Sequence, residues 1–175
     1  MSALRIEPLT AEEVPHVVAY WRESTDQHLI GMGVDLEKLP PPEDIEHMLC
    51  RSLETNLEER NSYCLIWHLD GAPIGHCNTN PTLYGDEAFM HLHAWSSAKR
   101  GKGFGTEAVR LCAQRFMEDL ELKHLYCSPK SDNRAANRVL EKCGFRSVKI
   151  HRTVPGSINY EQEVHLWEYV PGSIS

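Results

Sequence analysis

The spacing of hydrophobic residues along the chain predicts an alternation of strands and helices. Short stretches of alternating or continuous apolar side chains are typical of strands, and apolar residues repeated every three to four positions are typical of helices. Strands are predicted over residues 4–9, 62–69, 73–78, 87–95, 123–128, 145–154 and 160–169. Helices are predicted over residues 10–24, 42–60, 106–117 and 133–143. The order of these elements indicates one α+β domain spanning residues 1–175.

Residues that favour turns separate the predicted elements. Thr10 and Glu13 have the capping-box spacing at the start of the first helix. Two glycines and three consecutive prolines lie between Asp26 and Pro42, so this stretch is expected to be largely loop. Asn80-Pro81 marks a further loop before the strand over residues 87–95.

The strand over residues 87–95 has two chemically different faces, because side chains alternate across a strand. Met90, Leu92 and Ala94 point one way and are expected to be core. The other face carries Glu87, Phe89, His91, His93 and Trp95.

The two imidazoles on that face, His91 and His93, are candidates for a general base or a water relay, with Glu87 as the competing base. Structural packing beside the two aromatic residues explains the histidines equally well. The pair could also bind a metal ion, but no third ligand is evident in the sequence, so no metal is expected.

A glycine-rich turn, Lys99-Arg-Gly-Lys-Gly-Phe-Gly-Thr106, connects this strand to the next helix. Three glycines in five positions do not suit the interior of a strand or helix, because glycine there loses the most backbone entropy and packs nothing. Their amides are expected at a helix N-terminus, where free N–H groups and the helix dipole favour a phosphate. Arg100 and Lys102 add two positive charges. The turn is therefore predicted to cradle a pyrophosphate.

The composition of the chain indicates which kinds of binding partner and which cellular compartment to expect. The 175 residues carry a formal net charge of −7, which disfavours nucleic acid and mildly favours a cationic substrate. Six cysteines lie far apart without C-x-x-C spacing, which favours reduced, mostly buried thiols over zinc or disulfides. The first residues include charges and no apolar run, so neither a signal peptide nor a membrane span is expected. These features predict a cytoplasmic protein.

Two motifs carry a family resemblance. Gly103-Phe-Gly-Thr-Glu-Ala108 meets a short form of the dinucleotide fingerprint. Taken from Arg100, however, the same stretch is Arg-x-x-Gly-x-Gly and resembles the acetyl-CoA loop of the GNAT acyltransferase superfamily. The segment Asn133-Arg-Ala-Ala-Asn-Arg-Val-Leu-Glu-Lys-Cys-Gly-Phe145 is similar to the second GNAT signature, an Asn-led helix ending in Gly-Phe. Both motifs occur in the expected order and spacing, so the chain resembles this superfamily.

The GNAT resemblance implies a fold, a donor and a set of binding residues. The fold is a mixed sheet of six or seven strands, splayed at its centre, with helices on both faces. The donor is acetyl-CoA, with its pantetheine arm near Trp95 and Asn133. Its pyrophosphate is expected on the amides of Arg100, Gly101, Lys102, Gly103, Phe104, Gly105 and Thr106.

One position departs from the family pattern. Many GNAT enzymes have a tyrosine as general acid where this chain has Leu140. The segment instead resembles the branch of ribosomal-protein N-terminal acetyltransferases, which usually have serine where this chain has Ala136. Ser128, at the end of the preceding strand, is a substitute catalytic candidate, with Tyr126 and Cys127 beside it.

The resemblance implies acetyl transfer to a primary amine by direct attack in a ternary complex. An amine attacks a thioester only when neutral, and deprotonation at pH 7 costs about 4.6 kcal/mol for lysine but about 1.1 kcal/mol for an α-amine. A chain with no tyrosine at the usual acid position and an ambiguous base therefore suits a peptide or protein α-amine, or a small amine of similarly low pKa. The 26–42 loop and the 155–160 turn are expected to line the acceptor site.

Two other functions and the assembly stay open at this point. A catalytically weak acyl-CoA-binding module is favoured by Leu140 and by the absence of a certain base. A nicotinamide enzyme lacks a convincing acidic ribose partner. A homodimer is one option for the assembly.

Overall fold

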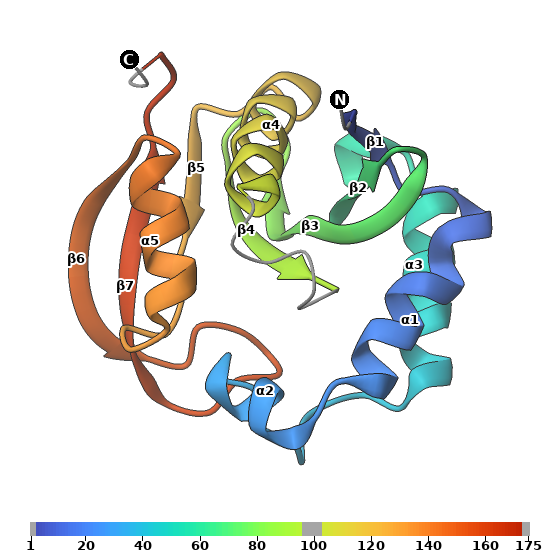
Figure 1. The fold of residues 1–175 in the computed structure, drawn as a ribbon, viewed down its shortest axis with the longest axis horizontal. Coiled ribbons are helices and arrows are strands. Elements are labelled where there is room, and N and C mark those ends of the chain that lie inside the picture. Colours follow the sequence, from blue (N-terminus) through green and yellow to red (C-terminus); the bar gives the residue numbers. More distant parts are fainter. Residues whose placement is uncertain (1–2, 96–102, 173–175) are drawn as a thin grey trace.

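The computed structural model describes residues 3–95 and 103–172 (Figure 1). Within them, seven strands form one mixed sheet in the order β1-β2-β3-β4-β5-β7-β6. The strands are β1 (Leu4–Pro8), β2 (Tyr63–Leu69), β3 (Ala72–Leu83), β4 (Glu87–Ala94), β5 (His124–Cys127), β6 (Phe145–Thr153) and β7 (Gln162–Tyr169). The helices are α1 (Val14–Glu23), α2 (Asp26–Gly31), α3 (Pro42–Glu54), α4 (Phe104–Asp119) and α5 (Arg134–Lys142), with 3₁₀ turns at Ala11–Glu13 and Leu57–Glu59. The predicted α+β class and mixed sheet are confirmed.

The sheet splays between its two central strands. Neighbouring strands are antiparallel except β4 and β5, which are parallel. This parallel pairing runs only from Glu87 opposite His124 to Phe89 opposite Tyr126. Beyond Phe89, β4 continues to Ala94 without β5 paired beside it. The predicted splay is confirmed, and it leaves one backbone edge of β4 without a neighbouring strand.

Helices pack on both faces of the sheet, as predicted. Side chains of β2 alternate between two cores: Leu65 and Trp67 pack in the core that includes α4, and Cys64 and Ile66 pack with α1 and α3. In β4, Met90 is fully buried in the α4 core, and Leu92 and Ala94 pack against it. The predicted apolar face of β4 is thus confirmed.

The stretch over residues 26–42 was predicted to be largely loop, but its first part is a helix that the sequence analysis missed. Asp26–Gly31 form α2, because Thr25 caps this helix by accepting a hydrogen bond from the His28 N–H at 3.1 Å. Leu29 is buried and anchors the helix to the protein interior. The sequence analysis missed this helix because its six residues include only one buried side chain, which is too few to show a helical repeat of apolar positions.

Two further boundaries differ from the prediction. Helix α3 ends at Glu54 rather than near Arg60, and a separate 3₁₀ turn follows. Strand β3 continues through the expected loop at Asn80-Pro81, and its register shifts between Thr79 and Thr82. A β-bulge accommodates the proline, which has no N–H for the ladder.

The structure also bears on the predictions about the cysteines and about membrane-spanning segments. All cysteines but Cys50 are buried, and all six thiols are free. No helix in the described ranges has both the length and the apolar character needed to cross a membrane.

Candidate active site

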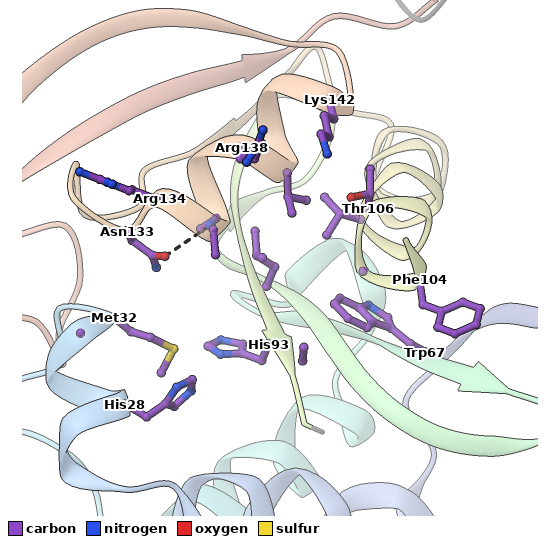
Figure 2. Close-up of a pocket in the computed structure, with 18 of the residues that line it drawn as sticks. His28, Met32, Trp67, His93, Phe104, Thr106, Asn133, Arg134, Arg138 and Lys142 are labelled. Atoms are coloured by element: carbon purple, nitrogen blue, oxygen red, sulfur yellow. Dashed lines mark hydrogen bonds between the residues drawn. The ribbon is translucent and has the colours of Figure 1, made fainter. Parts of the chain in front are cut away.

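A cavity of about 640 Å³ opens at the end of β4, where the sheet splays. Its walls come from α2, β4, the start of α4 and α5, so segments far apart in the sequence meet there (Figure 2). His28 and His93 lie at one end of it. Thr106, Arg138 and Lys142 lie at the other end.

The start of α4 is built around a glycine. Gly103 is the N-cap and has a φ of +82°, in the left-handed region that favours glycine. A Cβ added to Gly103 or Gly105 would meet no heavy atom of the described residues within 4 Å, so this surface is open toward them. The first N–H groups of a helix have no partner inside it, and they carry the positive end of the helix dipole. The arrangement suits an anion in the cavity.

The structure places part of the predicted pyrophosphate cradle at this end of the cavity. Gly103, Phe104, Gly105 and Thr106 all line it. The other three predicted cradle residues, Arg100, Gly101 and Lys102, lie outside the described residues.

A basic stripe on α5, which the sequence analysis did not single out, runs along the same cavity. Arg134, Arg138 and Lys142 are spaced four residues apart, so they lie along one side of the helix, and all three line the cavity. None of them forms an ion pair with another residue of the described ranges. Leu140, the residue that replaces the usual tyrosine, is fully buried in the core. The spacing of the three cations was the sequence signal that would have revealed the stripe.

Asn133 begins α5 and also lines the cavity. Its Oδ1 accepts a hydrogen bond from the Ala136 N–H at 3.3 Å, which makes it the helix N-cap. Asn133 is thus a helix cap at the wall of the cavity.

His93 is at the opposite end of the cavity and is only 9% exposed. Its Nδ1 lies 3.0 Å from the Tyr20 hydroxyl. That hydroxyl also lies 3.1 Å from His28 Nε2 and 3.5 Å from Met32 Sδ. The helix α1, the α2 segment and β4 therefore meet at one hydrogen-bonded cluster.

A second imidazole supports the ring of His93. His76, opposite it on β3, stacks on His93 with ring centroids 4.6 Å apart and an interplanar angle of 23°. Trp95 Nε1 donates to His76 Nδ1 at 2.8 Å, so this nitrogen carries no proton. Burial lowers the pKa of His76 to about 3, and burial with the neighbouring His76 holds the pKa of His93 well below its usual range. Both rings are neutral near pH 7.

The other sequence-based catalytic candidates lie elsewhere. His91 Nε2 is held by the Asn80 carbonyl at 2.8 Å. Glu87 is exposed at the far end of β4, roughly 20 Å along the strand from Ala94 at about 3.3 Å per residue. Ser128 follows β5. Among the described residues that line the cavity, none of these three is found.

Trp95 was expected beside the pantetheine arm. Its indole N–H is bonded to His76, and its ring packs in the second core with α1 and α3. Its backbone N–H donates to the Ile74 carbonyl at 3.0 Å, which continues the pairing of β3 with β4.

Comparison of the sequence with models of known protein families identifies the family of this chain. Residues 3–146 match the family model described as an acetyltransferase (GNAT) domain. The chain belongs to the GNAT acetyltransferase family. It is an acetyl-CoA-dependent N-acetyltransferase, as the two sequence motifs predicted.

Solved structures of other GNAT enzymes share this fold. RimL, an α-N-protein acetyltransferase of ribosomal protein L7/L12 solved with coenzyme A, superimposes with a TM-score of 0.75 at 12% identity, over 95% of this chain and 93% of that one. The microcin C7 self-immunity acetyltransferase MccE, solved with acetyl-CoA and AMP, gives 0.74 at 15% identity over 94% and 92%. A variant of the Vibrio cholerae spermidine N-acetyltransferase SpeG gives 0.72 at 16% identity over 94% and 92%.

The residues of this GNAT chain fit a CoA thioester. The open surface at Gly103 and Gly105 suits the phosphates, as do the cations of α5, which form no ion pair with the described residues. The splay beyond Phe89 leaves strand-edge groups for the amides of a pantetheine arm. Within the described ranges, no cluster of three or more histidine, cysteine, aspartate or glutamate side chains is arranged to hold a metal ion.

The α2 segment is held in place by the loop before β7 and by the first residue of that strand. Gly33, just after α2, accepts hydrogen bonds at 2.9 Å from the side-chain amides of Asn159 and the buried Gln162. The Tyr160 hydroxyl donates to the Ile30 carbonyl at 3.1 Å. Of the two segments predicted to line the acceptor site, residues 26–42 contribute α2 side chains to the cavity wall, and the 155–160 turn belongs to the segment that supports α2.

Substituting Gly33 with alanine is expected to lower the free energy of unfolding by about 2–4 kcal/mol. Gly33 has a φ of +88°, and an added Cβ would collide with the buried Gln162 side chain. Chemical denaturation with a circular-dichroism readout measures the effect. The matched control is Gly31→Ala, two residues away, where the Cβ meets nothing within 4 Å and a stabilisation of about 0.5–1 kcal/mol is expected. Equal stability of the two variants would contradict this account of the α2 anchor.

Proposed function

We propose that this GNAT enzyme acetylates an amine of low pKa, either the α-amine of a peptide or protein or a small amine of similar pKa, by direct attack on acetyl-CoA in a ternary complex. The observation that carries the proposal is the cavity itself. It joins an anion-binding end, formed by α4 and α5, to a neutral, buried histidine at its other end.

The donor end has clear roles for individual residues. The amides at the start of α4 and the side chains of Arg138 and Lys142 bind the phosphates, and Asn133 orients the pantetheine arm. Bound there, acetyl-CoA supplies an activated acetyl thioester. His93 lies at the opposite end of this cavity from Arg138 and Lys142 (Figure 2).

The acceptor end opens through a second, adjoining cavity of about 560 Å³. The two cavities share Tyr20, His28 and Ala94, so an acceptor entering the second one arrives beside the His93 cluster. The second cavity also contains Glu23 and no lysine or arginine among its described lining residues. A carboxylate with aromatic neighbours suits a positively charged amine.

The protonation state of His93 favours an acceptor that loses its proton easily. His93 is neutral at pH 7, so it is ready to accept a proton, but its lowered pKa makes it a weak base. A lysine side chain, which is costly to deprotonate, requires a stronger base than this. An α-amine requires much less, because its pKa is close to 7.8.

Competition between two peptides is expected to show this preference. One peptide has a free N-terminus and no lysine, and the other is blocked at its N-terminus and carries one lysine. At pH 7 the free N-terminus should be acetylated faster, as measured by mass spectrometry of the products. Faster acetylation of the blocked lysine peptide would contradict the proposal. Tight CoA binding without turnover on any amine of a broad panel would instead support a weakly catalytic acyl-CoA-binding module.

We also propose a cytoplasmic location. Six free thiols, all but one buried, suit a reducing compartment.

A further inference from the structure

We propose that Tyr20 and His28 are positioning residues that select the tautomer of His93 and hold its ring in the orientation for proton transfer. The inference rests on the proposed function, in which His93 takes the proton of the acceptor amine. It adds two residues, from α1 and α2, that neither sequence motif includes.

The hydrogen-bond geometry limits how the protons are arranged. The Tyr20 hydroxyl lies 3.0 Å from His93 Nδ1 and 3.1 Å from His28 Nε2. A hydroxyl has one proton to donate and can also accept. In the proposed arrangement, Tyr20 donates to His28 Nε2 and accepts from the His93 Nδ1–H, and the His93 Nε2 then carries the lone pair. This nitrogen has no hydrogen-bond partner among the described residues, and the ring lines the cavity, so its lone pair is available to the acceptor.

The same arrangement stabilises the product of proton uptake. When His93 gains a proton at Nε2, its ring becomes a buried cation, and the Nδ1–H bond to the Tyr20 oxygen becomes charge-assisted. The stacked His76 stays neutral and adds no second positive charge beneath the ring. The Tyr20 oxygen thus offsets part of the cost of burying the positively charged His93 ring, through its contact with Nδ1.

The fold holds both residues firmly against His93. The rings of Tyr20 and Trp21 on α1 lie 5.2 and 5.0 Å from the His93 ring, centroid to centroid. His28 is placed by α2, which the Gly33 contacts with the loop before β7 hold in position. The cluster is therefore assembled from parts of the chain that only the tertiary structure brings together.

Removing the Tyr20 hydroxyl tests the assignment. Tyr20→Phe keeps the ring but is expected to lower kcat by about 10- to 100-fold with a free-N-terminus peptide, while the KM for acetyl-CoA stays unchanged. The acid limb of the kcat/KM pH profile should move to lower pH, because the cationic form of His93 loses a hydrogen bond. The titratable groups that face His93 are Tyr20, His28 and His76, together with His91 on its own strand. The three histidines are unchanged in the Tyr20→Phe variant. Tyr63→Phe is the matched control, since its hydroxyl bonds Asp119 far from the cavity, and its kcat should not change.

A double variant separates positioning from a merely structural effect. Adding Tyr20→Phe to His93→Gln should lower kcat no further than His93→Gln alone, because Tyr20 acts through His93. An additive loss, or an unchanged kcat and pH profile in Tyr20→Phe, would overturn the inference while leaving His93 as the base. Should Tyr20→Phe fail to fold, His28→Gln is measured in the same way, and a wild-type kcat and pH profile would overturn the inference equally. Full activity in His93→Gln would instead reject the proposed base.

Discussion

Replacing His93 with glutamine is expected to lower kcat/KM by about 10²–10⁴ while CoA affinity stays unchanged. Glutamine occupies a similar volume and can still hydrogen-bond Tyr20, but it cannot take a proton from the acceptor at neutral pH. The donor end of the cavity, at α4 and α5, is left intact. Steady-state kinetics with a peptide acceptor and calorimetry with CoA measure the two quantities separately.

The same substitution at the two other candidates on β4 identifies the base. His91→Gln should keep most of the rate, because the His91 ring is held by the Asn80 carbonyl and does not line the cavity. Glu87→Gln should do the same, because Glu87 is exposed at the opposite end of the strand. A loss confined to either of these variants would transfer the role of base to that residue.

Replacing Gly103 with valine is expected to reduce CoA affinity by about 100-fold or more. A branched side chain at a φ of +82° costs about 1–3 kcal/mol of backbone strain, and relief of that strain would turn the first amides of α4 away. The added side chain would also occupy the open surface where the phosphates are proposed to bind. Calorimetric titration of the folded variant with CoA measures the loss.

A glycine far from the cavity controls for the effect of strain alone. Gly71, in the hairpin between β2 and β3, has a φ of +85° and an equally open surface. Gly71→Val should lower the melting temperature by an amount similar to Gly103→Val but leave CoA affinity intact. Wild-type affinity in Gly103→Val would remove the start of α4 from the proposed donor site.

Much of the fold and the donor site was predictable because the signals are local. The alternation of side chains in 87–95 predicted a strand with one apolar face, and Met90 is indeed fully buried. The glycine-rich turn predicted a strand-to-helix connection, and α4 begins at Phe104 directly after the left-handed Gly103. The two motifs predicted the family, which the match over residues 3–146 confirms.

The basic stripe of α5 was only partly predictable from the sequence. The four-residue spacing of Arg134, Arg138 and Lys142 is present in the sequence and follows from helix geometry alone. Its relevance depends on which face of α5 turns toward the cavity, and Leu140 decides this by packing into the core. The sequence contains the stripe, and the structure shows what it faces.

The sequence by itself determined the order of the strands, the polar face of β4 and the turn that opens α4, because each depends on neighbouring residues only. The choice of His93 over His91, and the cluster with Tyr20 and His28, was decided only by tertiary structure. Tyr20 and His93 are 73 positions apart, and their 3.0 Å contact exists because α1 packs across the end of β4. No local pattern encodes such a contact, since adjacent residues set the conformation of a segment, whereas the packing of distant segments sets which side chains meet.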